Sequence, residues 1–368
     1  MTPAENQKLE WLQALRGVAA MMVLFYHLGT HWAQSFHLSH GLPIVKWGFS
    51  GVDVFFVLSG LVVSMSAERL SGPGEARRFF SRRAIRVYFG YWPALVFAML
   101  VFGLLDNAQY HADQKAFSSL LLLSFWPGNH WLGTAWTLSF ELYFYLGMAL
   151  LICFGKKSNR PMLLALAFMA VASWNAGLMF YDKSAFVGGA QPLRTWMSAY
   201  ILEFIAGALI ASFRQQVRWN PVLAVVALSL AFASAAVGSF SEWFDRIELL
   251  RVGSFGVAAV AIVFIALMLQ AANKLQPPRW LVAVGDASYS LYLLHASLVA
   301  LLYILLDRLK IANSHARLLY EIAVPVVCIG FSYAWYRLIE YPLHRWGVQT
   351  LMPDRPAKRP AADNPAEG

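Results

Sequence analysis

One stretch near the start of the chain sets its architecture: Leu12-Gln-Ala-Leu-Arg16-Gly-Val-Ala-Ala-Met-Met-Val-Leu-Phe-Tyr-His27. It belongs to a mostly apolar run over residues 12–31, and about 20 such residues are what an α-helix needs to cross the hydrocarbon core of a bilayer. Two ionisable residues, Arg16 and His27, interrupt the run. Ionisable groups inside a bilayer are costly, so both are candidates for a functional site.

The composition of the whole chain agrees with this stretch. Of its 368 residues, 59% are hydrophobic and 13% are charged, whereas a soluble globular domain carries about 25% charged residues. Too little polar surface remains to cover a water-soluble globule of this size. The composition therefore excludes a cytosolic enzyme, a disordered chain and a nucleic-acid binder in solution, and it indicates an integral membrane protein.

Ten stretches are long and apolar enough to be read as spans. They lie near 12–31, 48–66, 87–105, 135–154, 162–180, 198–213, 221–238, 252–272, 285–306 and 318–340. The sixth is short and the first and last contain charges, so nine or eleven spans are also compatible with the sequence. The predicted fold is all-α, a polytopic membrane helix bundle. We expect a membrane domain over residues 1–346 and a disordered tail over 347–368, rich in Pro, Ala and charge.

The lysines and arginines predict the orientation of the bundle. With the N-terminus inside, the inner segments carry twice as many of these residues as the outer loops, to which Arg251 is assigned. Cytoplasmic loops are the ones enriched in Lys and Arg, so we expect both termini in the cytoplasm. This asymmetry accounts for most of the net charge of +9 without a nucleic-acid partner.

Arg16 and His27 have a spacing that suits one helical face. Eleven residues are almost a whole number of turns, and they separate the two side chains by roughly 16 Å along the helix axis. Arg16 is then expected near the cytoplasmic mouth, with His27 deeper in the membrane. The alternative is an arginine that extends to the interface beside a hydrogen-bonded core histidine.

A basic segment, Arg77-Arg78-Phe-Phe-Ser-Arg82-Arg83-Ala-Ile-Arg86, reads as an inner loop. Arg83 and Arg86 are three residues apart at the entrance to the next span, so they share one helical face. The planar guanidinium group suits phosphate oxygens, and a phosphate-bearing cytosolic ligand is one interpretation. The other is the ordinary excess of positive charge on the inner side.

Two further spans carry polar candidates. Glu141, in the fourth span, must find a partner such as Arg16 or His27, become protonated or face a wet cavity. Tyr292 and His295 lie one helical turn apart in the ninth span and form a possible additional site.

Several other polar residues have simpler interpretations. Asp53, a further site candidate, is placed to cap the outer end of the second span. Glu340 closes the last span, because Pro342 disfavours helix at the residue before it. Three histidines, His31, His37 and His40, are expected in a solvated loop without metal-binding geometry. We expect no metal site.

Five motifs in this order resemble those of the acyltransferase-three family of membrane O-acyltransferases. They are Leu15-Arg-Gly-Val-Ala-Ala through His27, Gly51-Val-Asp-Val-Phe-Phe-Val-Leu-Ser-Gly60, Arg83-x-x-Arg86, Trp136-Thr-Leu-Ser-x-Glu141-x-x-Phe-Tyr and Ser288-Tyr-Ser-Leu-Tyr-Leu-Leu-His295. The resemblance covers nearly the whole chain, from about Leu12 to Pro342.

The resemblance implies a bundle of about ten spans that transfers acyl groups, usually acetyl, to sugar hydroxyls of surface polysaccharides and lipopolysaccharide. The family's arginine and histidine pair falls on Arg16 and His27, and its glutamate falls on Glu141. Its inner arginine pair, Arg83 and Arg86, would bind the donor. Some members carry a C-terminal esterase-like domain that this chain lacks, which favours single-domain exopolysaccharide or O-antigen modifiers.

The resemblance also implies a donor, an acceptor and a location. The donor would be cytosolic acyl-CoA, in the usual case acetyl-CoA, docked by its phosphates on the inner arginines. The acceptor would be a glycan, either on a polyprenyl carrier or already outside. His27 would act as general base or as transient acyl carrier. The expected location is the bacterial inner membrane, and the oligomeric state is left open.

Two alternatives compete with this prediction. The same chemistry could serve a macrolide, another small hydroxylated molecule or a lipid as acceptor. In a different class, Arg16, His27, Glu141 and His295 could form the proton relay of a transporter or flippase for lipid-linked sugars. Against transport, no pair of symmetrically placed broken helices indicates inverted repeats.

Overall fold

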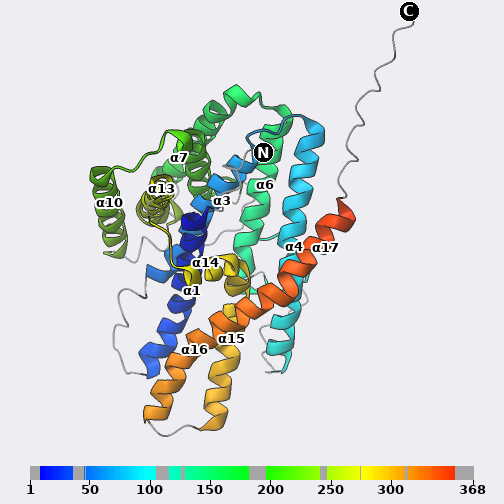
Figure 1. Ribbon diagram of the computed structural model, residues 1–368, viewed down its shortest axis with the longest axis vertical. Helices are drawn as coiled ribbons and strands as arrows, with labels where there is room; N and C mark the ends of the chain where they lie inside the picture. Colours follow the sequence, from blue (N-terminus) through cyan, green and yellow to red (C-terminus); the bar gives the residue numbers. More distant parts are fainter. Residues whose placement is uncertain are drawn as a thin grey trace, which may run out of the picture.

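The computed structural model describes residues 9–35, 45, 47–104, 116–125, 128, 130–181, 196–240, 247–273, 275–310 and 314–352. This part of the chain is helical and contains no strand. The longer helices are α1 (Glu10–Ser35), α3 (Gly51–Ala67), α4 (Pro73–Leu104), α6 (Trp136–Phe154), α7 (Arg160–Tyr181), α9 (Tyr200–Phe213), α10 (Pro221–Ser239), α13 (Val257–Ala272), α15 (Ser288–Leu309), α16 (Ser314–Trp335) and α17 (Tyr341–Leu351). Figure 1 shows them as one bundle, with α10 on its periphery.

Shorter helical elements join the long ones. They are η2 (Trp47–Ser50), α5 (Ala116–Leu121), η6 (Gly133–Ala135), η7 (Lys157–Asn159), η9 (Arg214–Gln216), α12 (Glu248–Arg251), α14 (Arg279–Asp286) and two π-helical turns, η10 (Val252–Gly256) and η11 (Tyr336–Glu340). Each π-turn continues directly into the α-helix that follows it.

Nine stretches among the described residues are long and apolar enough to cross a membrane. They cover 10–33, 47–67, 73–103, 133–154, 157–179, 221–239, 248–272, 288–309 and 315–351. The predicted all-α, multi-span bundle is confirmed. The sixth predicted span corresponds to α9, which has only 14 residues and is too short to be counted with the nine. The orientation of the termini and the boundary of the tail remain predictions.

Three boundaries differ from the sequence-based prediction. The basic segment around Arg83 is not a loop, because α4 begins at Pro73 and includes it. His31 is not in a loop either, since α1 continues to Ser35; His37 and His40 lie outside the described residues. The last span does not end at Glu340 but runs through η11 into α17. Pro342 follows directly after the π-turn η11, and local π-helical turns are one way in which membrane helices accommodate a proline without ending.

The α16–η11–α17 segment forms one long rod that runs diagonally across the molecule beside α4 (Figure 1). It extends the predicted last span past its predicted end as far as Leu351. The first residues of the predicted tail, from Gly347, are therefore helical, and residues 353–368 lie outside the described part. The π-turn in the middle of the rod contains Glu340, whose position matters for the site.

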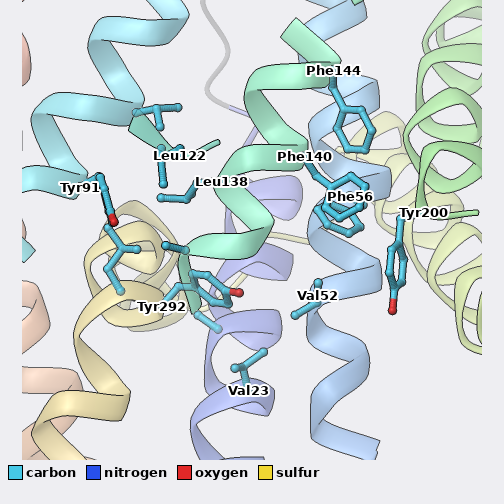
Figure 2. Packing of buried hydrophobic residues seen from close by; sticks show 14 of the residues in the cluster. Val23, Val52, Phe56, Tyr91, Leu122, Leu138, Phe140, Phe144, Tyr200 and Tyr292 are labelled. Atoms are coloured by element: carbon cyan, nitrogen blue, oxygen red, sulfur yellow. The ribbon is translucent and has the colours of Figure 1, made fainter. Parts of the chain in front are cut away.

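Aromatic side chains fill the centre of the bundle. The Phe56 ring of α3 lies 5.8 Å from the Phe140 ring and 5.6 Å from the Phe144 ring of α6, and 5.7 Å from the Tyr200 ring of α9. Figure 2 shows these rings side by side. Rings at these separations add attraction beyond the area that they bury. Rings of α6 and α9 also meet directly, because the Phe144 ring stacks on the Phe204 ring at 4.2 Å, so the cluster joins α3, α6 and α9 to one another.

The contact between α3 and α9 depends on two glycines. A Cβ atom added to Gly60 would collide with the carbonyl oxygen of Phe204, and one added to Gly207 would collide with that of Val57. The two backbones therefore touch, as small residues permit in helix pairs within membranes. This close approach holds the short helix α9 inside the bundle.

We predict that Gly207→Ala destabilises the protein, because its methyl group has no room against the α3 backbone. Overpacking of this kind costs about 1–3 kcal/mol, and thermal unfolding of the detergent-solubilised protein measures it. Gly147→Ala on the exposed face of α6 is the matched control, since nothing lies near its Cβ position and alanine is about 1 kcal/mol the better helix former. Equal midpoints for both variants would contradict the close contact.

Candidate active site

A cavity of about 100 Å³ lies between α1, α3, α4, α6 and α15. One wall is apolar and comes mainly from α3. The polar residues on its lining are Arg16, Ser59, Arg83, Arg86, Thr137, Glu141, Tyr145, Ser288, Tyr289 and Tyr292. The cavity thus joins four of the residues singled out from the sequence as charged candidates, together with Tyr292.

Charges of both signs meet at this cavity. Arg16 of α1 interacts electrostatically with Arg86 of α4, and both arginines interact with the carboxylates of Glu141 and Glu340. Glu340 is 9% exposed. A buried charge without compensation is strongly destabilising, so two cations and two carboxylates in one region balance each other. The sequence had assigned Glu340 only to the end of a span, and the π-turn brings it into this group.

Neutral partners hold each carboxylate in place. The Tyr145 hydroxyl, one turn further along α6, donates a hydrogen bond to Glu141. The same tyrosine ring lies 5.6 Å from the guanidinium carbon of Arg83. Ser290 of α15 donates to Glu340. Glu141 therefore has Tyr145, Arg16 and Arg86 among its neighbours, and Arg16 is one of the two partners that the sequence suggested for it.

Tyr292 stands at the boundary of the cavity. Its hydroxyl accepts a 3.0 Å hydrogen bond from Thr137 of α6 and donates one of 3.2 Å to the carbonyl oxygen of Thr134. Figure 2 shows its ring inside the bundle among α15, α1 and α6. The nearby Ser288 hydroxyl is fully buried, lines the cavity and has no hydrogen-bond partner among the described residues. It is available to a ligand.

The two predicted histidines form a pair next to the cavity. His295 is 1% exposed, and its Nε2 atom lies 3.3 Å from Nδ1 of His27. The Tyr292 ring is 5.9 Å from the His295 ring. Neither histidine lines the cavity itself, and Tyr292 is a lining residue that also contacts the pair. The helix α1 contributes Arg16 to the cavity lining and His27 to the contact with His295 of α15.

Asp53 does not have the role that its position in the sequence suggested. The N-cap residue of α3 is Ser50, and Asp53 accepts two hydrogen bonds, of 3.2 and 2.8 Å, from Arg251. Its side chain is completely buried and that of Arg251 is 13% exposed. Arg251 is therefore not an outer-loop residue: it ends α12 inside a candidate span. The pair lies apart from the cavity lining.

Sequence reasoning missed several residues of this interior. Arg251 lies 198 residues from Asp53, and no local spacing links the two. Its guanidinium carbon is 4.7 Å from the centre of the Phe49 ring. Glu203 was also missed, although a carboxylate in the apolar run 198–213 was a visible signal; it is 1% exposed. The four-residue spacing of Glu141 and Tyr145 was a usable signal as well.

The described residues contain no group of three or more His, Cys, Asp and Glu side chains that could hold a metal. The donor groups around the cavity are instead arginines, hydroxyls and carboxylates. Arginine side chains form charge-assisted hydrogen bonds with anionic groups such as phosphates.

Comparison with known proteins identifies the class to which this fold and cavity belong. Residues 9–337 match the family model described as the acyltransferase domain, so the chain belongs to this family of acyltransferases. The predicted family is confirmed, and with it the predicted enzyme class, an acyltransferase. No solved structure matches the chain.

Three relatives are similar over most of this chain. The exopolysaccharide production protein ExoZ of Rhizobium meliloti is 29% identical over 310 residues, which are 82% of this chain and 90% of that protein. The peptidoglycan O-acetyltransferase OatA of Listeria monocytogenes is 24% identical over 374 residues, 91% of this chain and 56% of that protein. The O-acetyltransferase OatA of Staphylococcus aureus is 22% identical over 378 residues, 93% and 58% respectively. The chain thus spans little more than half of the two OatA proteins.

We predict that Arg251→Gln destabilises the protein strongly, because it leaves the buried Asp53 without its cation. Breaking a buried pair costs about 3–5 kcal/mol. The matched control is Arg214→Gln, which breaks a pair with Glu68 whose side chains are 22% and 48% exposed and should cost about 0–1 kcal/mol. Thermal unfolding in detergent compares the two. If both variants unfold at the same temperature, the buried pair does not stabilise the bundle.

Proposed function

We propose that this protein transfers an acetyl group from cytosolic acetyl-CoA to a hydroxyl of a surface polysaccharide or a lipid-linked glycan. The observation that carries the proposal is the cavity on which Arg16, Arg83, Arg86 and Glu141 converge beside the His27–His295 pair. It joins an anion-binding end to a basic imidazole, the two parts that acyl transfer from coenzyme A requires.

The donor would enter through a groove that adjoins the cavity. This groove has a volume of about 540 Å³ and shares Arg83 and Arg86 with the cavity. Arg78, Arg82 and His344 also line it. Small-molecule sites measure about 300–1,000 Å³, so the groove suits the phosphorylated nucleotide end of the donor. The narrow cavity then suits its slender pantetheine arm, and the Ser288 hydroxyl is placed to bind an amide of that arm.

The proposed chemistry follows from the positions of the arginine-rich groove and the histidine pair. His27 removes the proton of the acceptor hydroxyl, and the oxygen attacks the thioester carbonyl carbon. The carbon–sulfur bond breaks, and the thiolate of coenzyme A takes up the proton from the imidazolium. A transient acyl-histidine is the other route that His27 permits. In both routes the thioester reaches His27 by way of Tyr292, where the cavity borders the histidine pair.

The names of the relatives support a glycan acceptor. One is named for exopolysaccharide production and another for peptidoglycan O-acetylation. The arginine-rich groove at one end and the histidine pair further along α1 let donor and acceptor approach from different sides. With both termini in the cytoplasm, the arginines face the cytosol, as a protein of the bacterial inner membrane would need. A small-molecule or lipid acceptor is the alternative.

We predict that His27→Ala abolishes acetylation without removing the protein from the membrane. Glycan NMR and mass spectrometry on a deletion strain, complemented with each form, measure the O-acetyl content. The wild type should restore the O-acetyl signal and His27→Ala should not. His315→Ala, at an exposed position of α16, is the matched control and should restore it.

Other results of this experiment favour other functions. A glycan that keeps its acetyl groups but disappears from the cell surface would favour a transporter. An unchanged glycan would favour a small molecule or a lipid as the acceptor. Normal acetylation by His27→Ala would refute its role as base or acyl carrier.

We predict that Arg83→Gln weakens donor binding, because its guanidinium group lines both the groove and the cavity. Hydrogen bonds to charged groups contribute about 1.5–3 kcal/mol, which corresponds to a KM for acetyl-CoA raised about tenfold to a hundredfold. Radiolabelled acetyl-CoA and inverted membrane vesicles measure this KM. Arg218→Gln, at an exposed position outside both cavities, should leave it unchanged. An unaltered KM in Arg83→Gln would place the phosphates elsewhere.

A further inference from the structure

The two imidazoles at the boundary of the cavity are attached to their helices in the same way. Nδ1 of His27 lies 2.9 Å from the carbonyl oxygen of Val23, one turn earlier in α1. Nδ1 of His295 lies 3.2 Å from the carbonyl oxygen of Leu291, one turn earlier in α15. A carbonyl oxygen only accepts hydrogen bonds, so each Nδ1 atom carries the hydrogen.

These two bonds determine the hydrogen bond between the rings. A neutral imidazole with its hydrogen on Nδ1 has a free lone pair on Nε2. His295 therefore offers Nε2 as an acceptor, and the Nδ1–H group of His27, 3.3 Å away, is the donor. This hydrogen is shared between His295 and Val23. In this tautomer the lone pair that a base needs is on the Nε2 atom of His27.

We propose that His295 is a positioning residue for His27, with a neutral imidazole in the place where many hydrolases use a carboxylate. It accepts the Nδ1–H bond, fixes the rotation of the His27 ring and keeps Nε2 aimed at the reacting hydroxyl. The inference rests on the proposed function and adds to it a second residue at the same site.

The polarity of the pair fits its surroundings. His295 is 1% exposed and lies among apolar residues of α15, where an ionised carboxylate would be costly to bury. A neutral acceptor avoids that cost in the resting state. When His27 takes the proton of the acceptor hydroxyl on Nε2, its Nδ1–H group stays bonded to His295 Nε2, which stabilises the imidazolium. The proton then passes from Nε2 to the leaving thiolate, and both rings return to their starting state.

Substitution of His295 tests the proposal in inverted vesicles of the full-length protein with radiolabelled acetyl-CoA and the endogenous membrane acceptor. His295→Leu removes the acceptor and should lower the maximal rate about tenfold to a hundredfold, because the hydrogen bond to the charged imidazolium is lost. The KM for acetyl-CoA should stay within about twofold. His295→Gln offers a carbonyl oxygen at similar reach and should recover most of the rate.

A spectroscopic measurement separates positioning from packing. Nitrogen NMR of the ¹⁵N-histidine-labelled protein in nanodiscs should show the Nδ1–H tautomer for both rings. This readout does not depend on activity.

The outcomes are distinguishable. If the wild type transfers acetyl and His27→Ala does not, but His295→Leu equals the wild type, the positioning role is wrong and the proposed function stands. Equal losses in His295→Leu and His295→Gln, or an Nε2–H tautomer at His27, would also overturn it. If the wild type transfers no acetyl group, the proposed function fails, and the role of His295 in it fails as well.

Discussion

The arrangement of this bundle depends on the need to balance buried charge. Arg16 and Arg86 would each be prohibitively costly in an apolar interior without carboxylates nearby. Glu141 and Glu340 supply these charges from α6 and η11. Because the four residues come from four different segments, their attraction selects one packing of these segments among the many that apolar surfaces alone would allow. The cavity is where these segments meet without filling the space between them.

The sequence predicts much of this because charge is conspicuous inside an apolar run. Arg16, His27 and Glu141 could each be located from the cost of burying them, and the spacing of Arg83 and Arg86 placed both on one face. The sequence does not predict which residues far apart along the chain pair with each other. Asp53 begins a helix and so suggests a cap, but its partner Arg251 lies 198 residues away. A single sequence contains no signal for such a contact.

Local rules also fail where tertiary contacts oppose them. Pro342 predicts a helix end, yet the rod continues, because the π-turn directly before it is a local adjustment of the kind that accommodates a proline within a membrane helix. The π-turn before it adds a residue to one helical turn and thereby changes the direction of the following side chains. Glu340 is the last residue of that turn, and its carboxylate reaches Ser290. The π-turn, which the sequence did not predict, thus adds Glu340 to the group of buried charges.

The arginine-rich end of the site and the histidine pair differ in what they require of a ligand. The arginines line a wide groove and attract a ligand through its negative charge. This attraction acts over a long range and does not require a rigid ligand. The histidine pair lies beyond Tyr292 in a buried region, where only a correctly directed lone pair is useful. In the proposed function, a donor held first by its phosphates would explore the narrow cavity with its distal end before the thioester meets His27. Because the groove and the histidine pair are built from different residues, the proposed role of His295 concerns the chemical step and not the binding of the donor.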